Sequence, residues 1–348
     1  MNILITSSAR RIDFVGFFKD ALKSLGIEGN VITADPEYNA PSLQAGDKNY
    51  MIPHQTAPGY LDAIFNICTK EHVNCIVPLN DWEVPKLAAA KHKFVEKDIK
   101  LFVPDESVVE KVRDKGKYRE LLQPFEVKAP FSYLNVTDAE KGLESGEVDY
   151  PLIIKPRNGS ASMGVEFAYN VEELQHAYDC AVREIKESPL DDATSKSAEE
   201  NVIIQEVIEG DKFSLDIFND LDGNYVTSLV RRQFAMRGGD IDKCVTENSE
   251  ELLEIGEKIG SNLKHAGYIN TDVYYDGKNY YVIDINPRFG GGYAFSHRAG
   301  ANIPAAIINI TRGEKVDEDW LTQQAGLDLA RHDTVVAIDK EKPTVMNR

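Results

Sequence analysis

Residues 268–300 read YINTDVYYDGKNYYVIDINPRFGGGYAFSHRAG, with two alternating apolar runs on either side of a short polar stretch. The dipeptide Asp-Gly at 276–277, placed between such runs, is a strong signal for a β-hairpin. The sequence therefore predicts two antiparallel strands joined by a tight turn. Because each lies a few residues from that turn, Asp272 and Asp284 are expected near each other across the hairpin.

The second predicted strand carries polar side chains on one face. Side chains alternate along a strand, so Asp284, Asn286 and Arg288 share a face while the residues between them are apolar. Mg²⁺ is usually held by one or two carboxylates plus substrate phosphates, and an arginine can meet the remaining phosphate oxygens. With Asp272, this set predicts a magnesium–nucleotide site. A hairpin with a solvated face is less favoured, because the strand runs into glycines 290–292, whose backbone can approach a ligand closely.

Composition limits the classes of function. The 348 residues carry a formal net charge of -18, which argues against a nucleic-acid or anionic-membrane surface. The four cysteines show neither C-x-x-C pairing nor metal-site spacing, as is typical of reduced, buried thiols. No apolar run approaches about 18 residues, the length of a membrane-spanning helix. We therefore expect a cytoplasmic protein that binds neither nucleic acid nor membrane.

The first 105 residues alternate between two patterns. Short β-type runs lie at 2–6, 30–34, 75–79 and 100–103, and helical patterns lie between them at 12–25, 60–71 and 82–96. This alternation predicts a parallel, doubly wound sheet. Ligands of such sheets bind beyond the carboxyl ends of the strands.

Several charged residues near the predicted strand ends and in the downstream glycine-rich region allow two interpretations. Arg10 and Arg11 are either contacts for an anion at a helix start or surface arginines, with equal weight. For Asn80, Asp81 and Glu83, capping of the next helix is favoured over a substrate contact, with Asp81 as the expected N-cap. His297 fits a structural role as well as that of a general base or substrate contact, and Arg298 could grip a carboxylate.

The segment around Lys155 has the features of a phosphate-binding strand and loop. Residues 150–156 form an apolar strand with Lys155 near its end, followed by small residues over 157–165. A lysine in that place faces a cleft and favours an anion, while Gly and Ser let backbone N–H groups close over phosphates. There is no Walker sequence, and a plain β-turn is the less favoured alternative.

A second apolar strand runs into a bend over residues 201–210. The bend is expected to leave backbone N–H and C=O groups of Glu206 to Ile208 free at its edge. An adenine ring needs such a paired donor and acceptor between apolar walls. An ordinary strand–turn–strand is the alternative.

Four other stretches have patterns that predict their secondary structure. Residues 107–122 are predicted to be helical, 184–200 to form a polar insertion without regular structure, 246–264 to form an amphipathic packing helix, and 334–338 to form a strand.

Taken together, Asp272, the run DINPR at 284–288, and the segments 296–297 and 299–304 resemble the metal-binding end of ATP-grasp enzymes. The resemblance is closest to the branch of the carbamoyl-phosphate synthetase large subunit, whose strand reads E-x-N-P-R. Asp284 stands where many relatives have Glu, which keeps the charge and shortens its reach.

The resemblance implies a fold class of mixed α/β and α+β type. It implies a Rossmann-like pre-ATP-grasp domain at 1–105 and a two-lobed ATP-grasp fold at 106–310, with a small lobe at about 115–205 and a large lobe at about 206–310. A C-terminal segment at 311–348 follows, and its role is not implied. The large subunit of carbamoyl-phosphate synthetase holds two ATP-grasp units, and this length accommodates one.

The resemblance also implies a role for individual residues. For ATP it implies Lys115, Lys155, Ser160, Met163, Gly164, Glu206, Val207, Ile208, Glu209 and Asp216; for Mg²⁺, with Mn²⁺ as an alternative ion, Asp272, Asp284 and Asn286; and for catalysis Arg231, Arg237 and Arg288. In this reading Glu209 accepts from ribose hydroxyls, and the arginines steady the transferring phosphoryl group.

The reaction implied is an ATP-dependent carboxylate–amine ligation. A substrate carboxylate attacks the γ-phosphate, and an amine takes the resulting acyl phosphate to give an amide or peptide bond with release of ADP and phosphate. The partners would be small-molecule carboxylates and amines, and a homodimer stays open. Two alternatives remain: a small-molecule kinase and a catalytically idle nucleotide-binding module.

Overall fold

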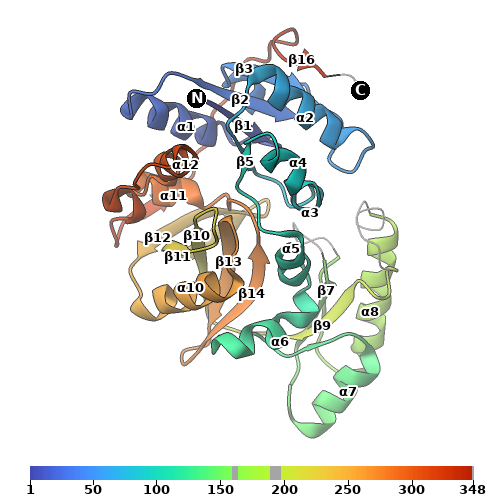
Figure 1. Cartoon of the computed structure of the whole chain (residues 1–348). Coiled ribbons are helices and arrows are strands. Elements are labelled where there is room, and N and C mark those ends of the chain that lie inside the picture. Colours follow the sequence, from blue (N-terminus) through green and yellow to red (C-terminus); the bar gives the residue numbers. More distant parts are fainter. Residues whose placement is uncertain (159–163, 189–196, 347–348) are drawn as a thin grey trace. The chain divides into compact units, whose positions relative to one another are not determined.

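The computed structural model describes residues 1–158, 164–188 and 197–346 (Figure 1). The chain forms two compact units. The first unit comprises Met1–Val109, Ser214–Asn270 and Pro287–Arg348, and the second comprises Glu110–Phe213 and Thr271–Asn286. The division predicted along the sequence, at about residues 105 and 310, stays a prediction.

The first unit contains a parallel sheet. Its strands lie in the order β16-β3-β2-β1-β4-β5, and all its pairings are parallel. The strands are β1 (Asn2–Thr6), β2 (Asn30–Asp35), β3 (Lys48–Met51), β4 (Cys75–Pro78), β5 (Lys100–Leu101) and β16 (Thr344–Val345). The predicted doubly wound sheet is confirmed, and β3 is an added strand whose polar residues hid it from pattern analysis.

Helices cover both faces of this sheet (Figure 1). Ile3 and Ile5 of β1 belong to the core formed with α1 and α12, whereas Leu4 packs in the core formed with α2, α3 and α4. The helices are α1 (Ile12–Ser24), α2 (Tyr60–Glu71), α3 (Val84–Ala89), α4 (Lys91–Val95) and α12 (Ile303–Arg312). Burial on both faces explains why the strands read as continuous apolar runs. The single helix predicted at 82–96 is two short helices.

A second sheet contains the predicted hairpin. Its strands lie in the order β14-β13-β10-β11-β12-β15. They are β10 (Asp211–Asn219), β11 (Tyr225–Arg237), β12 (Asp240–Glu247), β13 (Gly267–Tyr275), β14 (Tyr280–Asn286) and β15 (Asp328–Ala330). The hairpin is confirmed: the N–H of Asp276 donates to Asn279 O at 3.2 Å, and Gly277 takes the positive φ of 93° that the turn needs.

The amphipathic helix α10 (Glu250–Leu263) packs against β11. It begins later than the predicted residue 246 because Ser249 caps it, accepting from Leu252 N–H at 3.3 Å. Thr246 belongs to the end of β12 instead.

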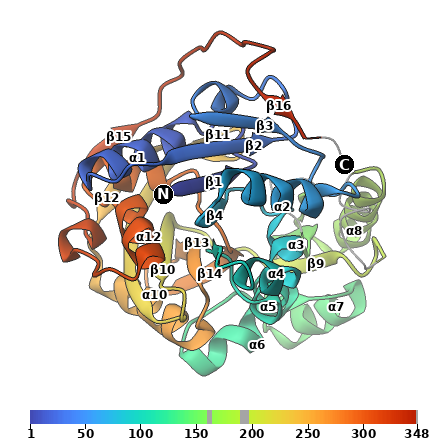
Figure 2. The same ribbon diagram turned by 45° about the horizontal axis from the view of Figure 1, so that its top comes forward.

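The strand predicted at 334–338 is wrong. These residues have no regular secondary structure, and Val335 is exposed. The C-terminal segment instead pairs at two other places, β15 with β12 and β16 with β3 (Figure 2). A β-branched run forms a strand only where a partner and a packing surface exist.

The second unit contains a four-stranded antiparallel sheet in the order β6-β9-β7-β8. Its elements are β6 (Ser132–Tyr133), β7 (Leu152–Pro156), β8 (Glu166–Ala168), β9 (Val202–Glu206), α7 (Val136–Ser145) and α8 (Val171–Lys186). Helix α8 packs on β7 and β8. The insertion predicted at 184–200 begins within α8, and its residues 189–196 lie outside the described residues.

The helix predicted at 107–122 is interrupted. It consists of α5 (Glu106–Arg113), the 3₁₀ turn η2 (Lys115–Lys117) and α6 (Tyr118–Leu122). The break occurs at Asp114, whose side chain accepts from Gly116 N–H. The remaining short elements are η1 (Pro41–Gln44), η3 (Gln123–Phe125), η4 (Glu318–Leu321) and α11 (Tyr293–Arg298).

No helix in the described part of the chain has both the length and the apolar character needed to cross a bilayer. The cysteines are free thiols, and Cys68, Cys75 and Cys244 are buried.

Candidate nucleotide and metal site

Five charged side chains of the second unit interact with one another. Lys115 Nζ lies 2.8 Å from Asp284 Oδ1, and Lys212 Nζ lies 3.0 Å from Asp272 Oδ2. The charges of both aspartates and of the other two lysines act on the pKa of Lys155, which lies on β7. We call these residues the lysine–aspartate cluster. Local sequence patterns and the family resemblance indicate four of these five residues. Lys212 has no such signal, because its position beside Asp272 depends on β10 neighbouring β13.

A buried ion pair positions Lys115. The Asp114 carboxylate accepts from Arg157 Nε at 2.5 Å and from Arg157 Nη2 at 2.7 Å, and Lys115 N–H donates to Arg157 O at 3.2 Å. Asp114 and Arg157 are both buried. A bidentate pair fixes geometry as well as supplying energy, so the residue after β7 holds the turn that carries Lys115. In the sequence, Asp114 and Arg157 are far apart and gave no signal of pairing.

A buried tyrosine positions Asp284. The hydroxyl of Tyr118 lies 2.6 Å from Val112 O and 3.5 Å from Asp284 Oδ1, and it accepts from Ile285 N–H at 3.0 Å. Burial raises the pKa of Tyr118 well above its usual range, so this hydroxyl keeps its proton. It therefore anchors both α6 and the strand that carries the carboxylate.

Burial and neighbouring charges shift the pKa values of three residues of the cluster. Burial alone would raise the pKa of Asp284, but Lys115 and then Lys155 outweigh it, and the pKa lies below its usual range. Burial likewise opposes the charge on Lys212, but Asp272 outweighs it and raises the pKa. Burial and then Lys115 lower the pKa of Lys155 to about 8. Within the described residues, the Lys155 ammonium makes neither an ion pair nor a hydrogen bond.

The possible metal ligands of the cluster are all oxygen atoms. Asp272 lies on β13, and Asp284 and Asn286 lie on β14, with the Asn286 side chain hydrogen-bonded to the Asp284 carboxylate. Two carboxylates and an amide suit a hard ion such as Mg²⁺ that shares its other positions with phosphate. Among residues 1–158, 164–188 and 197–346, no group of three or more His, Cys, Asp or Glu gathers at metal-binding distance.

One part of the adenine prediction is wrong. The N–H of Glu206 is not free, because it donates to Phe131 O at 3.0 Å, and the Glu206 carboxylate accepts from Phe131 N–H at 3.1 Å. Val207 and Ile208 follow the end of β9 and are half-buried, and Glu209 is exposed. Their contacts with adenine and ribose stay predictions.

The connection from β9 to β10 and the loop after β7 contain two glycines with positive φ. Gly210 has a φ of 138°, and a Cβ there would collide with the carbonyl of Tyr275. Gly164 has a φ of 63°. Ser160 and Met163, predicted to close over the phosphates, lie outside the described residues.

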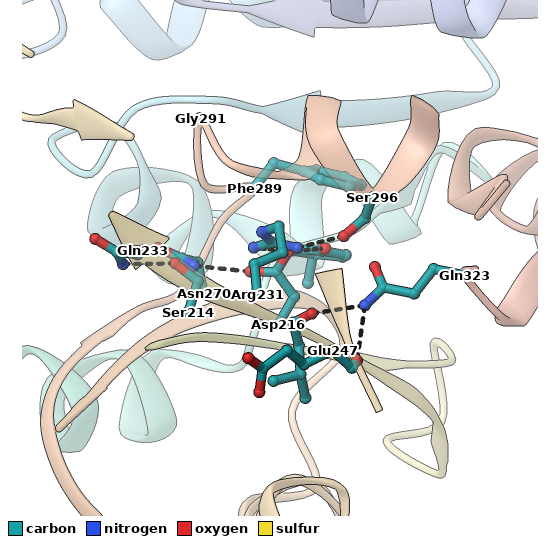
Figure 3. Close-up of polar contacts among 12 residues, drawn as sticks. Ser214, Asp216, Arg231, Gln233, Glu247, Asn270, Phe289, Gly291, Ser296 and Gln323 are labelled. Carbon is teal, nitrogen blue, oxygen red and sulfur yellow. Dashed lines mark hydrogen bonds and ion pairs between the residues drawn. The ribbon is translucent and has the colours of Figure 1, made fainter. Parts of the chain in front are cut away.

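Two other predicted site residues lie in the core of the first unit. Arg231 Nη2 lies 2.6 Å from Asp216 Oδ2, which also accepts from Tyr268 Oη at 2.5 Å, while Asp216 Oδ1 accepts from Asn270 Nδ2 at 2.7 Å. Arg231 Nη1 donates to Ser296 Oγ at 2.5 Å (Figure 3). We call these five residues the buried network. Its ion pair is fully buried.

This burial favours a supporting role for Asp216 and Arg231. Their charged groups make their hydrogen bonds within the first unit, where they join β10, β11, β13 and α11 (Figure 3). Their predicted contacts with ATP and with the phosphoryl group are untested. The sequence shows an aspartate and an arginine on alternating strands, which is equally typical of a ligand site and of a buried pair.

Arg237 and Arg288 also lie in the first unit. Arg237 is half-exposed and pairs with Asp242 at 3.0 Å and Asp333 at 2.5 Å. Arg288 Nη2 lies 2.6 Å from Asp81 Oδ2, so Asp81 is an ion-pair partner and the N-cap prediction for it is wrong. The N-cap residue of α3 is Glu83, two residues further on.

Arg11 converges with Arg288. Both arginines donate to the carbonyl oxygen of Phe289, at 2.9 and 3.0 Å. Burial and then Arg288 lower the pKa of Arg11 to about 10. Arg10 and Arg11 were each expected to be either a surface arginine or an anion contact. Arg11 is mostly enclosed, and Arg10 is exposed.

The glycines at 290–292 serve packing within the first unit. A Cβ on Gly290, Gly291 or Gly292 would meet the side chains of Asn270, Asp240 or Ile241 respectively. The expected close approach of their backbone to a ligand stays a prediction.

His297 has an aromatic environment. Its ring stacks on Phe17 with 3.7 Å between centroids, and Nδ1 lies 3.1 Å from Tyr293 Oη. Burial and then Arg298 lower the pKa of His297 to about 4. A neutral, stacked imidazole favours the structural interpretation.

Comparisons with known proteins agree with this architecture. Residues 3–102 match the family model described as PylC-like, N-terminal domain. Residues 198–335 match the model described as ATP-grasp in the biosynthetic pathway with Ter operon. The chain is therefore an ATP-grasp protein.

Its similarity to curated proteins narrows this class. The chain is 25% identical over 311 residues to the carbamoyl phosphate synthase large chain of Clostridium botulinum (strain Loch Maree / Type A3), with 86% of the chain and 27% of that enzyme aligned. It is an ATP-grasp protein with a single unit similar to those of carbamoyl phosphate synthase large chains. It spans about a quarter of the length of these relatives.

Two solved structures share the fold. One is the biotin carboxylase domain of Hydrogenobacter thermophilus 2-oxoglutarate carboxylase, in complex with MgADP, ADP and bicarbonate (TM-score 0.71, 20% identity, covering 91% of this chain and 71% of that chain). The other is the L-amino acid ligase from Bacillus licheniformis (TM-score 0.64, 18% identity, covering 92% of this chain and 77% of that chain). They confirm the mixed α/β fold predicted from the sequence.

Proposed function

We propose that this chain is an ATP-dependent carboxylate–amine ligase that acts through an acyl phosphate and releases ADP and phosphate. The lysine–aspartate cluster is the observation that carries the proposal. It places three lysines and two aspartates in one unit, with two ion pairs between them. This is the charge pattern needed to hold a polyphosphate and its divalent ion together.

Four residues of the cluster, together with Asn286, have distinct parts in the proposed chemistry. Asp272, Asp284 and Asn286 would hold Mg²⁺, which supplies charge neutralisation on the phosphates when bound. Lys115 and Lys155 would bind phosphate oxygens. The chain's own contribution is then positioning and electrostatic stabilisation, with no covalent protein nucleophile.

The proposal extends to the substrate classes. A carboxylate would attack the γ-phosphate, and an amine would displace phosphate from the acyl phosphate to form an amide or peptide bond. The similarity to an L-amino acid ligase supports an amide-forming reaction. Arg288 is the proposed contact for the transferring phosphoryl group.

The test is a screen of carboxylate and amine pairs for release of ADP from MgATP. An active pair is expected to lose activity by about 100-fold or more in Asp284→Asn, which removes one charge from the metal site. Asp149→Asn is the matched control, because Asp149 is an exposed carboxylate of the same unit. Circular dichroism and thermal melting should show that both variants are folded.

Hydroxylamine separates the proposed ligase from a kinase. An acyl phosphate reacts with hydroxylamine to give a hydroxamate, whereas a phosphorylated hydroxyl group does not. ADP release without hydroxamate would favour the kinase, and MgATP binding without ADP release across the panel would favour an idle module. Full activity in Asp284→Asn would reject the metal assignment.

A further inference from the structure

The lysine–aspartate cluster has more positive than negative groups. Three lysines face two aspartates, and two of the lysines already occupy the carboxylates, Lys115 on Asp284 and Lys212 on Asp272. Lys155 is near enough to these four residues for their charges to act on its pKa. Keeping a third cation in a partly buried site costs free energy, so the surplus positive charge is best explained by an anion that binds there.

Lys212 is placed as an integral part of this cluster. It lies on β10, which neighbours β13, the strand of Asp272. The side chains of Lys212 and Asp272 are 18% and 22% exposed. Both are thus largely enclosed yet open to a small ligand. The Lys212 ammonium also lies 5.9 Å from the centre of the Tyr274 ring, which gives it a second favourable contact.

We propose that Lys212 is a third phosphate-binding lysine, which leaves Asp272 for the β- and γ-phosphates when a divalent ion takes that carboxylate. This inference rests on the proposed function and extends it by one residue. The exchange keeps charges paired on both sides: ammonium groups move from carboxylate oxygens to phosphate oxygens, and the metal ion replaces them on the carboxylates. Lys115 and Asp284 would make the same exchange.

The distances make this exchange short. The ammonium groups of Lys115 and Lys212 lie 2.8 and 3.0 Å from the carboxylates that would hold the ion. Lysine is a flexible point charge on a long stem, so it can turn to a nearby oxygen without backbone movement. A guanidinium held in bidentate fashion, such as that of Arg157 on Asp114, lacks this freedom.

The alternative is that Lys212 only neutralises Asp272 and never touches the nucleotide. The two interpretations differ when the divalent ion is bound. If Lys212 binds phosphate, its removal weakens the binding of MgADP. If it only shields the carboxylate, its removal leaves MgADP binding unchanged or improves it, because the ion no longer competes with Lys212 for Asp272.

The experiment is calorimetric titration of the full chain with ADP and with AMP in excess Mg²⁺. For Lys212→Met we expect about a 10-fold weaker affinity for ADP, the size of one charge-assisted hydrogen bond, and an unchanged affinity for AMP, which lacks the outer phosphates. Lys212→Arg should retain most of the ADP affinity. Lys141→Met is the matched control, since Lys141 is an exposed lysine on α7 of the same unit.

The titrations distinguish failure of the proposed function from failure of the role proposed for Lys212. If the wild-type chain binds neither ADP nor MgATP, the proposed function fails. If the wild type binds ADP and Lys212→Met binds it equally well, only the role of Lys212 is overturned. Equal losses for ADP and AMP would also overturn it, because the outer phosphates would then not be what Lys212 contacts. Thermal melting of Lys212→Met establishes that the variant is folded.

Discussion

The lysine–aspartate cluster and the buried network are built from the same residue types but differ in access. In the buried network, Arg231 and Asp216 are both 0% exposed, and both oxygens of Asp216 accept hydrogen bonds from the chain. In the cluster, the paired side chains are between 10% and 22% exposed. The first arrangement is closed by its own hydrogen bonds, whereas the second can exchange partners with a ligand.

This difference has a physical origin. Two charges removed from water are tolerated when a good geometry and further hydrogen bonds compensate for the lost solvation. The buried network meets most of that condition through Tyr268, Asn270 and Ser296, and among the described residues only Arg231 Nε of the ion pair lacks a hydrogen-bond partner. The cluster meets it less completely, since Lys155 has a pKa lowered to about 8 by burial and then by Lys115. Incomplete compensation is typical of sites that bind charged ligands.

The largest expected effect tests the closed arrangement. Asp216→Ala leaves the Arg231 guanidinium buried without its carboxylate, and we expect a loss of about 3–5 kcal/mol in the free energy of unfolding. Urea denaturation followed by circular dichroism measures it. A loss below about 1 kcal/mol would mean that water reaches Arg231 and that the network is open like the cluster.

A double replacement sharpens this result. Asp216→Leu combined with Arg231→Met removes both charges and leaves no unpaired ion, so it should recover at least about 1 kcal/mol relative to Asp216→Ala. Recovery will be incomplete because Tyr268 and Asn270 lose an acceptor. A double variant less stable than Asp216→Ala would contradict the role of the unpaired charge.

The open arrangement predicts the opposite response to losing a charge. Lys155→Met removes a cation that burial disfavours, so the ligand-free protein should gain about 1–3 kcal/mol of stability while its affinity for nucleotide falls. Thermal melting and calorimetric titration measure the two effects. A variant that loses both stability and affinity would show that Lys155 supports the fold. Lys141→Met, on the exposed face of α7, should change neither quantity.

The same lysine predicts how stability depends on pH. The pKa of Lys155 is about 8 in the folded chain against an ordinary value of 10.5. Between these values the unfolded chain binds more protons, so the cost of the buried charge is present in full below about pH 8 and is relieved as the pH rises toward 10.5. The stability gained by Lys155→Met should therefore shrink over this window. A gain that stays constant from pH 7 to pH 10 would contradict the shift.

Local sequence patterns indicate the residues of the cluster better than those of the buried network. Lys155, Asp272 and Asp284 follow from a strand ending in lysine and from a hairpin with carboxylates on one face, whereas Lys115 was implied only by the resemblance to ATP-grasp enzymes. Lys212 was assigned no role because nothing in its own segment distinguishes it from a surface lysine. Its importance depends on which strand lies beside β10, and strand order across a sheet is set by the tertiary fold.

Burial is the second property that local pattern did not supply. Asp216 and Arg231 were predicted to contact the nucleotide and the phosphoryl group; the fold encloses both, and those contacts stay predictions. The strand expected at 334–338 is wrong because an apolar β-branched run is exposed there without a partner strand. The doubly wound sheet and the hairpin were predictable since strand periodicity and turn chemistry are local.

The smallest expected effect comes from a pair that is neither closed nor part of a site. Lys258 Nζ lies 2.8 Å from Glu254 Oε1 one turn away on α10, and the glutamate side chain is 64% exposed. Water solvates both charges in the folded and unfolded chain. A double-mutant cycle of Lys258→Ala and Glu254→Ala should therefore give a coupling energy of only about 0.3–0.5 kcal/mol. This coupling energy should vanish in high salt, whereas that between Asp216 and Arg231 should persist, because salt screens exposed charges far more than buried ones. A salt-sensitive coupling between Asp216 and Arg231 would place that pair in contact with solvent and remove the distinction between the two regions.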